Sequence, residues 1–356
     1  PLCSMYDKCG GCSLQHIPYP EQLKWKGRFV LEALSRIGGI EVDEVPVTGS
    51  PDTSQYRNRM TFTLRRLRGG RVVAGFHGLD RPGHVIDVRG ECVLPEPEIA
   101  SAWMALRDNW GSSARRLPSG GRLRLTLRNS RSGVDLLIEG GRSTWNPESL
   151  MTRVSPVSTV WHEPSDSGVI ELVYGRPHEE IWIEKELLLV GDVFLQVNRD
   201  AAQLLQEHVI AIAGSPDSAI DAYCGVGCYG RHLANSGTTV VGIDVNGAAL
   251  TSSSENEDVN YRTVKGAVEE HLANFLPVEL LILNPPRSGL ERTIPLQILN
   301  TPPETIIYVS CDPATLARDL DRLLSSYSLA GYQAFDLFPQ TAHIETVAVL
   351  KRSKNQ

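Results

Sequence analysis

The chain has 356 residues, enough for about two domains of ~150 residues each. Its hydrophobic fraction of 41% and charged fraction of 22% exclude a mainly disordered or fibrous protein. No apolar run approaches the ~18 residues that a membrane span needs, and the first residues, PLCSMY, lack the layout of a signal peptide. We therefore expect a cytoplasmic protein without membrane contact, in monomeric form.

Three closely spaced cysteines open the chain, Cys3, Cys9 and Cys12, with two glycines between the last two. An odd total of seven Cys without a signal peptide argues against a disulfide framework and for a reducing compartment. A site of four thiolates needs one more ligand, and Cys92 is the best candidate. Because the spacing differs from the paired CxxC of zinc ribbons, it favours an iron–sulfur cluster over zinc, and both over free thiols.

A helix is predicted after the cysteine loop, from Pro20 to Ile37, because apolar residues recur there with helical spacing and Gly38-Gly39 follow. We expect residues 18–50 to pack on the second domain. The side chains predicted for the buried face are Leu23, Val30, Leu34 and Ile37.

Residues 51–190 alternate apolar and polar side chains between turn signals, which predicts an antiparallel β-rich domain with one helix near 96–109. Together with residues 1–17 it forms the first expected domain. Its part 51–130 holds fourteen Arg, no Lys and seven acids, although the whole chain has a net charge of −7. Arg binds phosphate with a planar fork of donors, so this segment predicts a phosphate-contacting face. The alternative is a solvated surface whose Arg pair with local acids.

The pattern changes near residue 190. Helices and short apolar strands alternate over 191–356, which predicts an α/β domain with a doubly wound, mostly parallel sheet. Ligands of such sheets lie beyond the carboxyl ends of the strands. The crevice is therefore expected between four loops, at 221–230, 244–246, 284–290 and 310–313.

A glycine-rich loop follows the first of these strands. Gly225 and Gly227 belong to a G-x-G-x-x-G pattern, and Asp244 ends the next strand, as in a dinucleotide site. The fuller string DAYCGVG at 221–227 places Asp221 directly before the glycines. Its carboxylate would repel a pyrophosphate but could hold the α-ammonium of a methionine moiety. The string therefore favours S-adenosylmethionine over NAD, with Asp244 at the ribose.

A later strand, IIYVS at 306–310, delivers Cys311 to the same edge of the sheet, directly before a helix. A helix N-terminus lowers the pKa of a thiol and makes the thiolate available, although a lone Cys in such a place is more often a buried small hydrophobe. Two neighbours in the expected crevice favour Cys311 as a nucleophile. Asn284, in an NPPR turn, could hydrogen-bond a planar base, and Glu345 begins a late strand. A thiolate, a carboxylate and a methyl donor suit methylation at C5 of uracil, where thiolate addition at C6 activates C5. The base must then leave its stack to reach the thiol.

Taken together, these strings closely resemble the RNA uracil-C5 methyltransferase family over nearly the whole chain. The motifs are the cysteine loop with Cys92, QYRNR at 55–59, FLQVN at 194–198, DAYCGVG at 221–227, NPPR at 284–287, SCDP at 310–313 and HIE at 343–345. The resemblance implies a class I methyltransferase domain of the Rossmann type beside the β-rich domain. These residues lack the N-terminal small β-barrel RNA-binding domain of many relatives, which is expected either of a short branch of the family or of a trimmed chain.

The resemblance also implies roles for single residues. Cys311 would be the nucleophile and Glu345 the base that removes the C5 proton. Asn284 stands where many relatives have Asp, so it is expected to orient the uracil without acting as a base. A [4Fe–4S] cluster is implied on Cys3, Cys9, Cys12 and Cys92. The residues implied in the cofactor and base pocket are Gln196, Asp221, Tyr223, Gly225, Gly227, Cys228, Asp244, Asn284 and Arg287.

The expected product is 5-methyluridine in RNA, and DNA is not expected as a substrate. The leading target is 23S ribosomal RNA, with the T-loop of tRNA as the alternative. A cytosine-C5 methyltransferase is disfavoured because a Pro-Cys pair is expected where this chain has Pro286-Arg287. From other classes, an NAD-dependent oxidoreductase and an inactive, cluster-bearing RNA-binding protein remain as alternatives.

Overall fold

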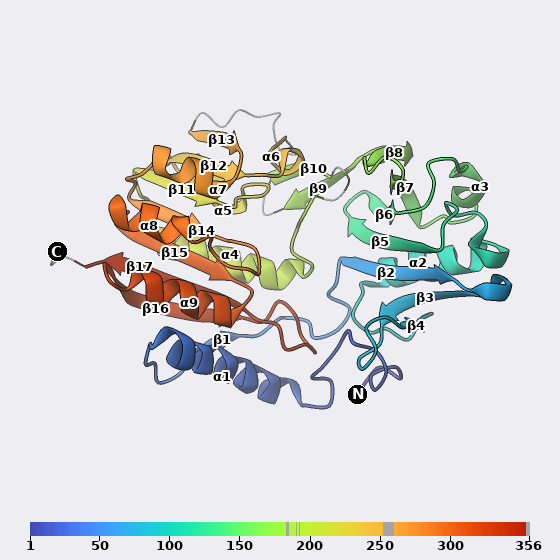
Figure 1. Ribbon diagram of the computed structural model, residues 1–356, viewed down its shortest axis with the longest axis horizontal. Helices are drawn as coiled ribbons and strands as arrows, with labels where there is room; N and C mark the ends of the chain where they lie inside the picture. The colour runs from blue at the N-terminus through green and yellow to red at the C-terminus, as the bar shows by residue number, and fades with distance from the viewer. Residues whose placement is uncertain (183–184, 190, 192, 252–259, 354–356) are drawn as a thin grey trace. The chain divides into compact units, whose positions relative to one another are not determined.

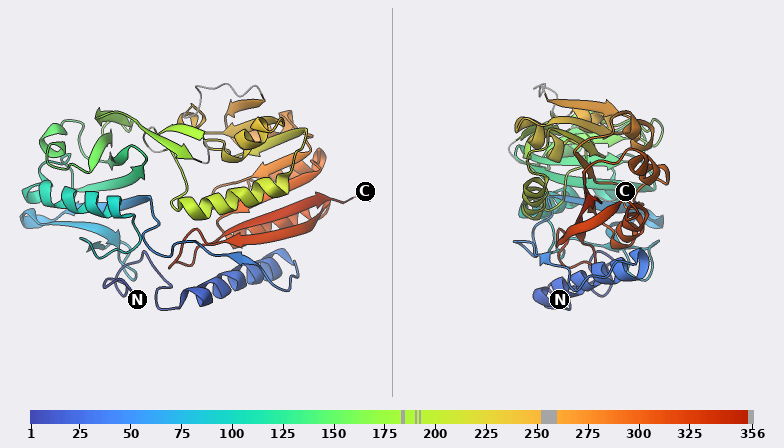
Figure 2. Two further views of the ribbon diagram at one scale, coloured as in Figure 1. Left: turned by 180° about the vertical axis from the view of Figure 1, so that it is seen from behind. Right: turned by 90° about the vertical axis from the view of Figure 1, so that its left-hand side faces the viewer.

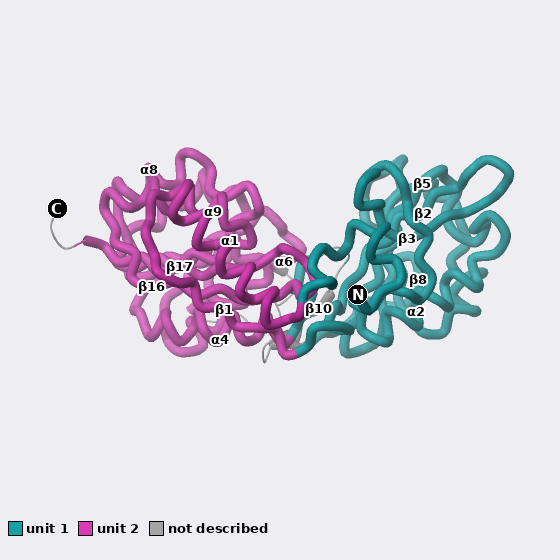
Figure 3. The backbone as a smooth tube through the Cα atoms, turned by 90° about the horizontal axis from the view of Figure 1, so that it is seen from below, with its two compact units in different colours: residues 1–17, 52–199 teal, residues 18–51, 200–356 magenta. Residues whose placement is uncertain are grey.

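The computed structural model describes residues 1–182, 185–189, 191, 193–251 and 260–353. It forms two compact units, residues 1–17 with 52–199 and residues 18–51 with 200–356 (Figure 3). The second boundary therefore lies nine residues later than expected. Two hydrogen bonds explain the difference, because they tie residues 193–197 to the first unit. The backbone N–H of Asn58 donates to the carbonyl of Val197, and the Arg128 side chain donates to the carbonyl of Val193. None of the described helices is long and apolar enough to cross a membrane.

The first unit is built on a seven-stranded sheet with the order β4-β3-β2-β5-β6-β7-β8 (Figure 1). Neighbouring strands are antiparallel except β6 and β7, so the expected antiparallel sheet is wrong at this pair. A parallel step needs a long crossover, and residues 140–156 supply it. The strands are β2 (Arg59–Arg66), β3 (Val72–His77), β4 (Val85–Asp87), β5 (Arg122–Ser130), β6 (Gly133–Glu139), β7 (Val157–Glu163) and β8 (Glu171–Tyr174), with β9 (His178–Trp182) and β10 (Lys185–Leu189) forming a separate pair. The helices are α2 (Pro97–Asn109), α3 (Glu148–Met151) and the short 3-10 turns η1 (Arg68–Gly70) and η2 (Ser112–Ala114).

One face of this sheet is the core of the first unit. Strands β2 and β5 alternate, and their apolar side chains pack against α2, where the Trp103 ring stacks on the Phe62 ring at 3.7 Å between centroids. Because successive side chains of a strand point to opposite faces, the polar residues of β2 and β5 share the other face. Its Arg and Thr residues are Arg59, Thr61, Thr63, Arg65, Arg122, Arg124, Thr126 and Arg128.

The second unit holds an eight-stranded sheet with the order β1-β16-β17-β15-β14-β11-β12-β13. Strand β17 runs antiparallel to both neighbours, and the other pairs are parallel. Helix α9 covers one face of the sheet and α4 the other (Figures 1 and 2). The strands are β1 (Val47–Thr48), β11 (Ser218–Ala222), β12 (Thr239–Asp244), β13 (Tyr261–Lys265), β14 (Leu280–Leu283), β15 (Thr305–Ser310), β16 (Tyr327–Phe335) and β17 (Glu345–Arg352). The helices are α1 (Tyr19–Gly38), α4 (Arg199–Ala213), α5 (Cys228–Asn235), α6 (Gly247–Thr251), α7 (Val268–His271), α8 (Thr293–Asn300), α9 (Pro313–Leu323) and the 3-10 turn η3 (Leu272–Asn274).

Helix α1 packs against α9, but its buried face differs from the expected one. Val30 and Leu34 are buried as predicted, whereas Ile37 is 49% exposed. The buried row continues toward the N-terminus with two polar residues, Gln22 and Lys26, each four residues from the next. The prediction failed there because an apolar pattern assigns polar side chains to solvent.

Candidate active site

The four parallel strands β15, β14, β11 and β12 are neighbours, so the loops that follow them meet at one edge of the sheet. Strand β17 runs the opposite way and therefore begins at this edge. Its pairing with β15 joins Ser310 to Thr346, and the next position along the two strands holds Cys311 and Glu345. The structure thus brings together the predicted nucleophile and the predicted base, although 33 positions separate them in the sequence.

Burial dominates the electrostatics of this pair. Glu345 is 4% exposed. Burial raises the pKa of its carboxyl to about 8, although the positive charge of Arg287 lowers this pKa by a smaller amount. Burial also raises the pKa of the Cys311 thiol, the negative charge of Glu345 adds to this, and Arg287 opposes it. A carboxylate with a pKa near neutrality is suited to act as a general base.

The expected lowering of the Cys311 pKa by the helix N-terminus is wrong in this structure. Asp312 is the N-cap of α9, and its carboxylate accepts hydrogen bonds from the backbone N–H groups of Ala314 and Thr315, each at 3.0 Å. The cap thus occupies donors that would otherwise stabilise a thiolate. Burial and the neighbouring carboxylate then decide the direction of the shift.

Arg287 connects the NPPR turn to the loop before β17. Its Nη2 lies 2.8 Å from Nδ1 of His343, two residues before Glu345. The guanidinium is exposed, while Asn284 is partly buried after β14 and donates its backbone N–H to the carbonyl of Ala222 at 3.3 Å. Both predicted base-contacting residues of this unit therefore lie at the same edge as Cys311.

Three residues of the glycine loop adopt a left-handed backbone conformation. Gly225 and Gly227 adopt left-handed conformations with φ of 56° and 82°, and Tyr223 does so with φ of 62°. At Gly227, a Cβ would also lie 2.6 Å from the hydroxyl oxygen of Tyr261, which is buried against the loop. A left-handed non-glycine residue such as Tyr223 is strained, and such strain gathers at functional sites.

Two carboxylates hold this loop. Asp244 Oδ2 accepts from the N–H of Gly225 at 2.8 Å, and its Oδ1 accepts from that of Asn246 at 2.7 Å. Asp221 Oδ2 accepts from the N–H of Gly230 at 2.9 Å, while its buried Oδ1 has no hydrogen-bond partner among the described residues. Burial raises the pKa of Asp221 to about 7. A buried acceptor without a donor is costly unless a ligand supplies one.

The two remaining predicted pocket residues lie in different units. Cys228 begins α5 directly after the glycine loop, and its carbonyl accepts from the Gln206 side chain at 3.0 Å. Gln196 belongs to the first unit, where its carbonyl accepts from the side-chain amide of Asn58 at 3.0 Å. Its part in a cofactor or base pocket stays a prediction.

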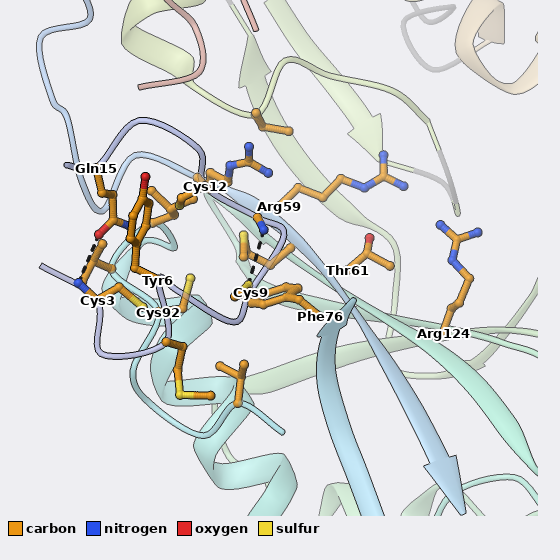
Figure 4. A pocket seen from close by; sticks show the side chains of 18 of the residues that line it. Cys3, Tyr6, Cys9, Cys12, Gln15, Arg59, Thr61, Phe76, Cys92 and Arg124 are labelled. Carbon is orange, nitrogen blue, oxygen red and sulfur yellow. Dashed lines mark hydrogen bonds between the residues drawn. The ribbon is translucent and has the colours of Figure 1, made fainter. Parts of the chain in front are cut away.

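In the first unit, all four predicted cluster residues line one cavity of about 430 Å³. Cys3, Cys9, Cys12 and Cys92 gather at one end of it, with Arg59, Thr61 and Arg124 toward the other (Figure 4). Burial raises the pKa of Cys92 to about 12. As placed, no three or more His, Cys, Asp or Glu side chains in the described parts of the chain form a group that could hold a metal ion.

The Arg- and Thr-bearing face of the first sheet carries further functional candidates, within the segment whose arginines predict a phosphate-contacting face. A second cavity is lined by Thr63, Arg65, His77 and Arg122, with Arg66 and Gly121 nearby. It lies on the same strands and the same face as Arg59, Thr61 and Arg124 of the first cavity. The alternation of Arg and Thr with apolar residues in β2 and β5 is the signal that could have identified this face.

The chain is similar to several known proteins. The family described as tRNA (Uracil-5-)-methyltransferase matches residues 260–353, which include Asn284, Cys311 and Glu345. An uncharacterized RNA methyltransferase of Thermosynechococcus vestitus is 33% identical, with 99% of this chain and 84% of the relative covered. One of Halalkalibacterium halodurans is 31% identical, with coverage of 98% and 82%. Among solved structures, the Pyrococcus abyssi tRNA (uracil-54, C5)-methyltransferase in complex with S-adenosyl-L-homocysteine aligns with a TM-score of 0.74 and 26% identity, covering 98% of this chain and 86% of that chain.

Proposed function

Because the chain belongs to the family of S-adenosylmethionine-dependent RNA uracil-C5 methyltransferases, we propose that it forms 5-methyluridine with Cys311 as nucleophile and Glu345 as base. The observation that carries these two roles is the strand pairing that sets Cys311 beside the buried carboxyl of Glu345. A nucleophile and a base must lie near the same reacting atoms, and these two share one edge of the sheet.

The proposed reaction proceeds by addition, methyl transfer and elimination. The Cys311 thiolate bonds to C6 of the uracil, and the C5–C6 electron pair moves toward O4 as an enolate. S-adenosylmethionine supplies an electrophilic methyl group, to which C5 bonds while the methyl–sulfur bond breaks. Glu345 then takes the proton from C5, the C5–C6 double bond re-forms, and the bond from Cys311 to C6 breaks to return the thiolate.

The residues present fit S-adenosylmethionine. Oδ1 of Asp221, which has no hydrogen-bond partner within the described ranges, is an acceptor for the ammonium of the methionine moiety, and the nearby Asp244 suits the ribose hydroxyls. The left-handed glycines leave the loop without side chains where a ligand would approach. S-adenosylmethionine has a positive sulfonium, a positive ammonium and one carboxylate, so its net charge is positive. Two acidic partners therefore suit it better than a pyrophosphate, which both carboxylates would repel.

For the RNA itself, 23S ribosomal RNA is the predicted target and tRNA the alternative. The solved relative from Pyrococcus abyssi acts on uracil 54 of tRNA, and this likeness favours the alternative. Unmodified 23S and tRNA transcripts, each incubated with labelled methyl donor and mapped for 5-methyluridine, separate the two. Methylation of 23S transcripts alone supports the prediction, and methylation of tRNA alone overturns it.

A [4Fe–4S] cluster on Cys3, Cys9, Cys12 and Cys92 belongs to the proposal, supported by the four thiols at one end of a common cavity. To hold the cluster, the four thiols would have to lie closer to one another than they do in this structure. Bound there, it would tie the N-terminal loop to the segment before α2, and it has no step in the methyl transfer. Iron content and thiolate-to-iron charge-transfer absorbance after anaerobic reconstitution test it, and iron-free protein after reconstitution would contradict it.

The two catalytic roles are tested by a pair of variants. Cys311→Ala should abolish methylation while RNA binding survives, because the uracil is no longer activated. Glu345→Gln should trap a methylated RNA–protein adduct on denaturing gels, because the C5 proton is not removed. The exposed Glu304→Gln, at the far end of β15, is the matched control and should behave as the parent protein. Freely dissociating RNA from Glu345→Gln, with parent-like product formation, would count against the assignment of the base.

A further inference from the structure

The segment that delivers Glu345 to the site is unusually long for its task. Strands β16 and β17 are antiparallel neighbours, and their last paired residues are Phe335 and Glu345. Nine residues, 336–344, join them, whereas hairpin loops commonly have about 2–5 residues. None of the nine lies in a helix or strand. A loop of this length does not fix the position of Glu345 by its own geometry.

Helix α1 holds this loop through two buried polar side chains. Lys26 Nζ donates to Asp336 Oδ1 at 2.6 Å and to the carbonyl of Phe338 at 3.1 Å. One turn earlier, Gln22 Nε2 donates to Gln340 Oε1 at 3.0 Å, and Gln22 Oε1 accepts from the Gln340 N–H at 3.1 Å. Lys26 and Asp336 are both 0% exposed, and Gln22 is 1% exposed.

The contacts continue from the α1 side chains to the active site. Thr341 Oγ1 donates to the same Phe338 carbonyl at 2.8 Å and accepts from the N–H of His343 at 3.2 Å. His343 in turn contacts Arg287, whose charge acts on both Cys311 and Glu345. A connected set of hydrogen bonds therefore runs from α1 to the residues around the nucleophile and the base.

Stability alone is a poor explanation for this arrangement. A buried ion pair often contributes no more than well-packed apolar residues of similar volume, because both charges lose their hydration. Here the carboxylate even leaves Oδ2 of Asp336 without a hydrogen-bond partner among the described residues. Gln340 moreover adopts a left-handed backbone with φ of 71°, a conformation that surrounding contacts must maintain. What the polar contacts do supply is a defined position for the loop.

We propose that Gln22 and Lys26 are positioning residues for the elimination step: they fix loop 336–344 so that the Glu345 carboxylate meets the C5 proton. The inference rests on the proposed function, because it takes Glu345 as the base. Both side chains are hydrogen-bonded to the loop that leads into Glu345, so addition and methyl transfer at Cys311 should depend on them less than proton removal does.

The test separates adduct formation from adduct release. Lys26→Met and Gln22→Leu are each compared with the parent protein in single-turnover reactions with RNA and labelled methyl donor, resolved on denaturing gels. We expect release of methylated RNA to slow by about 10- to 100-fold, the effect of small misplacements of a reacting group, while adduct formation changes by less than about threefold. The matched control is Lys24→Met, on the exposed side of α1, where the ammonium pairs with Glu21.

Each outcome decides the proposal. Slower release with parent-like thermal unfolding and cofactor affinity supports it, and equal slowing of both steps, or no slowing, overturns it. If Lys26→Met does not fold, Gln22→Leu, which keeps the ion pair, decides by the same criterion. Failure of the proposed function has a different signature, since Glu345→Gln would then not accumulate the adduct either.

Discussion

At the scale of single residues, the proposed role of Glu345 as the base makes adduct release depend on the ionisation of its carboxyl. Burial favours the neutral carboxyl and raises its pKa to about 8, so most molecules hold a protonated Glu345 at neutral pH. A base must be ionised, so the rate of adduct release should rise about tenfold per pH unit below 8 and level off above it. Rapid-quench measurements of the adduct at a series of pH values check this expectation.

Substitution of Arg287 should change this pH dependence. Its charge lowers the pKa of both Glu345 and Cys311, so Arg287→Gln should shift the rising part of the profile to higher pH. The exposed Arg292→Gln, on the N-terminal side of α8, is the matched substitution and should leave the profile in place. A profile that is flat between pH 6 and 9 in the parent protein would contradict the role of Glu345.

Asp221 makes the corresponding prediction for the cofactor. Its free Oδ1 should accept from the ligand's ammonium, so Asp221→Asn should weaken S-adenosylhomocysteine binding about tenfold, the value of one charge-assisted hydrogen bond. The Asn side chain still accepts from Gly230. Because the pKa of Asp221 is raised to about 7, affinity in the parent protein should increase as pH rises through 7. Calorimetric titration measures both effects, with the exposed Asp217→Asn, before the same strand, as control.

At the scale of elements, the local sequence pattern predicts a helix or strand correctly where its apolar residues form a single clear pattern. Strand β15 has the expected bounds to within a residue, because it is a short apolar and β-branched run beside turn residues. The same reasoning failed on α1, whose buried face includes Gln22 and Lys26. Their partners, Asp336 and Gln340, are more than 300 positions away, so no local pattern could indicate that these polar side chains are satisfied inside.

The arginine-rich face of β2 and β5 is the element on which RNA binding should depend. Arg65 and Arg122 are exposed neighbours across the two strands and line one cavity. Replacing either by Gln should weaken RNA binding and reduce the slope of log affinity against log salt by about 1, as expected for one lost phosphate contact. Fluorescence anisotropy at several salt concentrations measures the slope. The exposed Arg36→Gln on α1 should leave it unchanged, and a parent-like slope in both strand variants would exclude this face.

At the scale of the whole chain, the sequence motifs identify the chemistry but not which unit carries each residue. The active-site motifs from Asp221 to Glu345 lie in one unit because strand order brings their loops to one edge. Gln196 is predicted for the same pocket but belongs to the other unit. Its carbonyl accepts a hydrogen bond from the side chain of Asn58, the residue before β2. A linear pattern does not contain such long-range contacts, so it placed the boundary nine residues too early.

The division into units predicts that cofactor binding and RNA binding can be lost separately. Cys3, Cys9 and Cys12 lie in the unit of the arginine face, whereas the glycine loop lies in the other. Backbone hydrogen bonds, such as that from the N–H of Gly10 to the carbonyl of His77, hold the loop of the three cysteines to the end of β3. A Cys3→Ser, Cys9→Ser, Cys12→Ser variant should therefore lose the cluster and at least about tenfold in RNA affinity. Its affinity for S-adenosylhomocysteine should stay within about twofold of the parent value, since the glycine loop belongs to the other unit and shares no residue with the cysteine loop.

The triple variant is titrated once with RNA and once with S-adenosylhomocysteine. The two affinities show whether RNA binding and cofactor binding are lost separately or together. Cys224→Ser is unsuitable as a control because it alters the glycine loop, so Ser112→Ala in the first unit serves instead. Loss of both affinities together with a lower melting temperature would indicate that the cysteine loop stabilises the whole chain. Unchanged RNA affinity in protein shown to be free of iron would remove the cluster from RNA docking, since the thiols are then dispensable for the interaction that the arginine face provides.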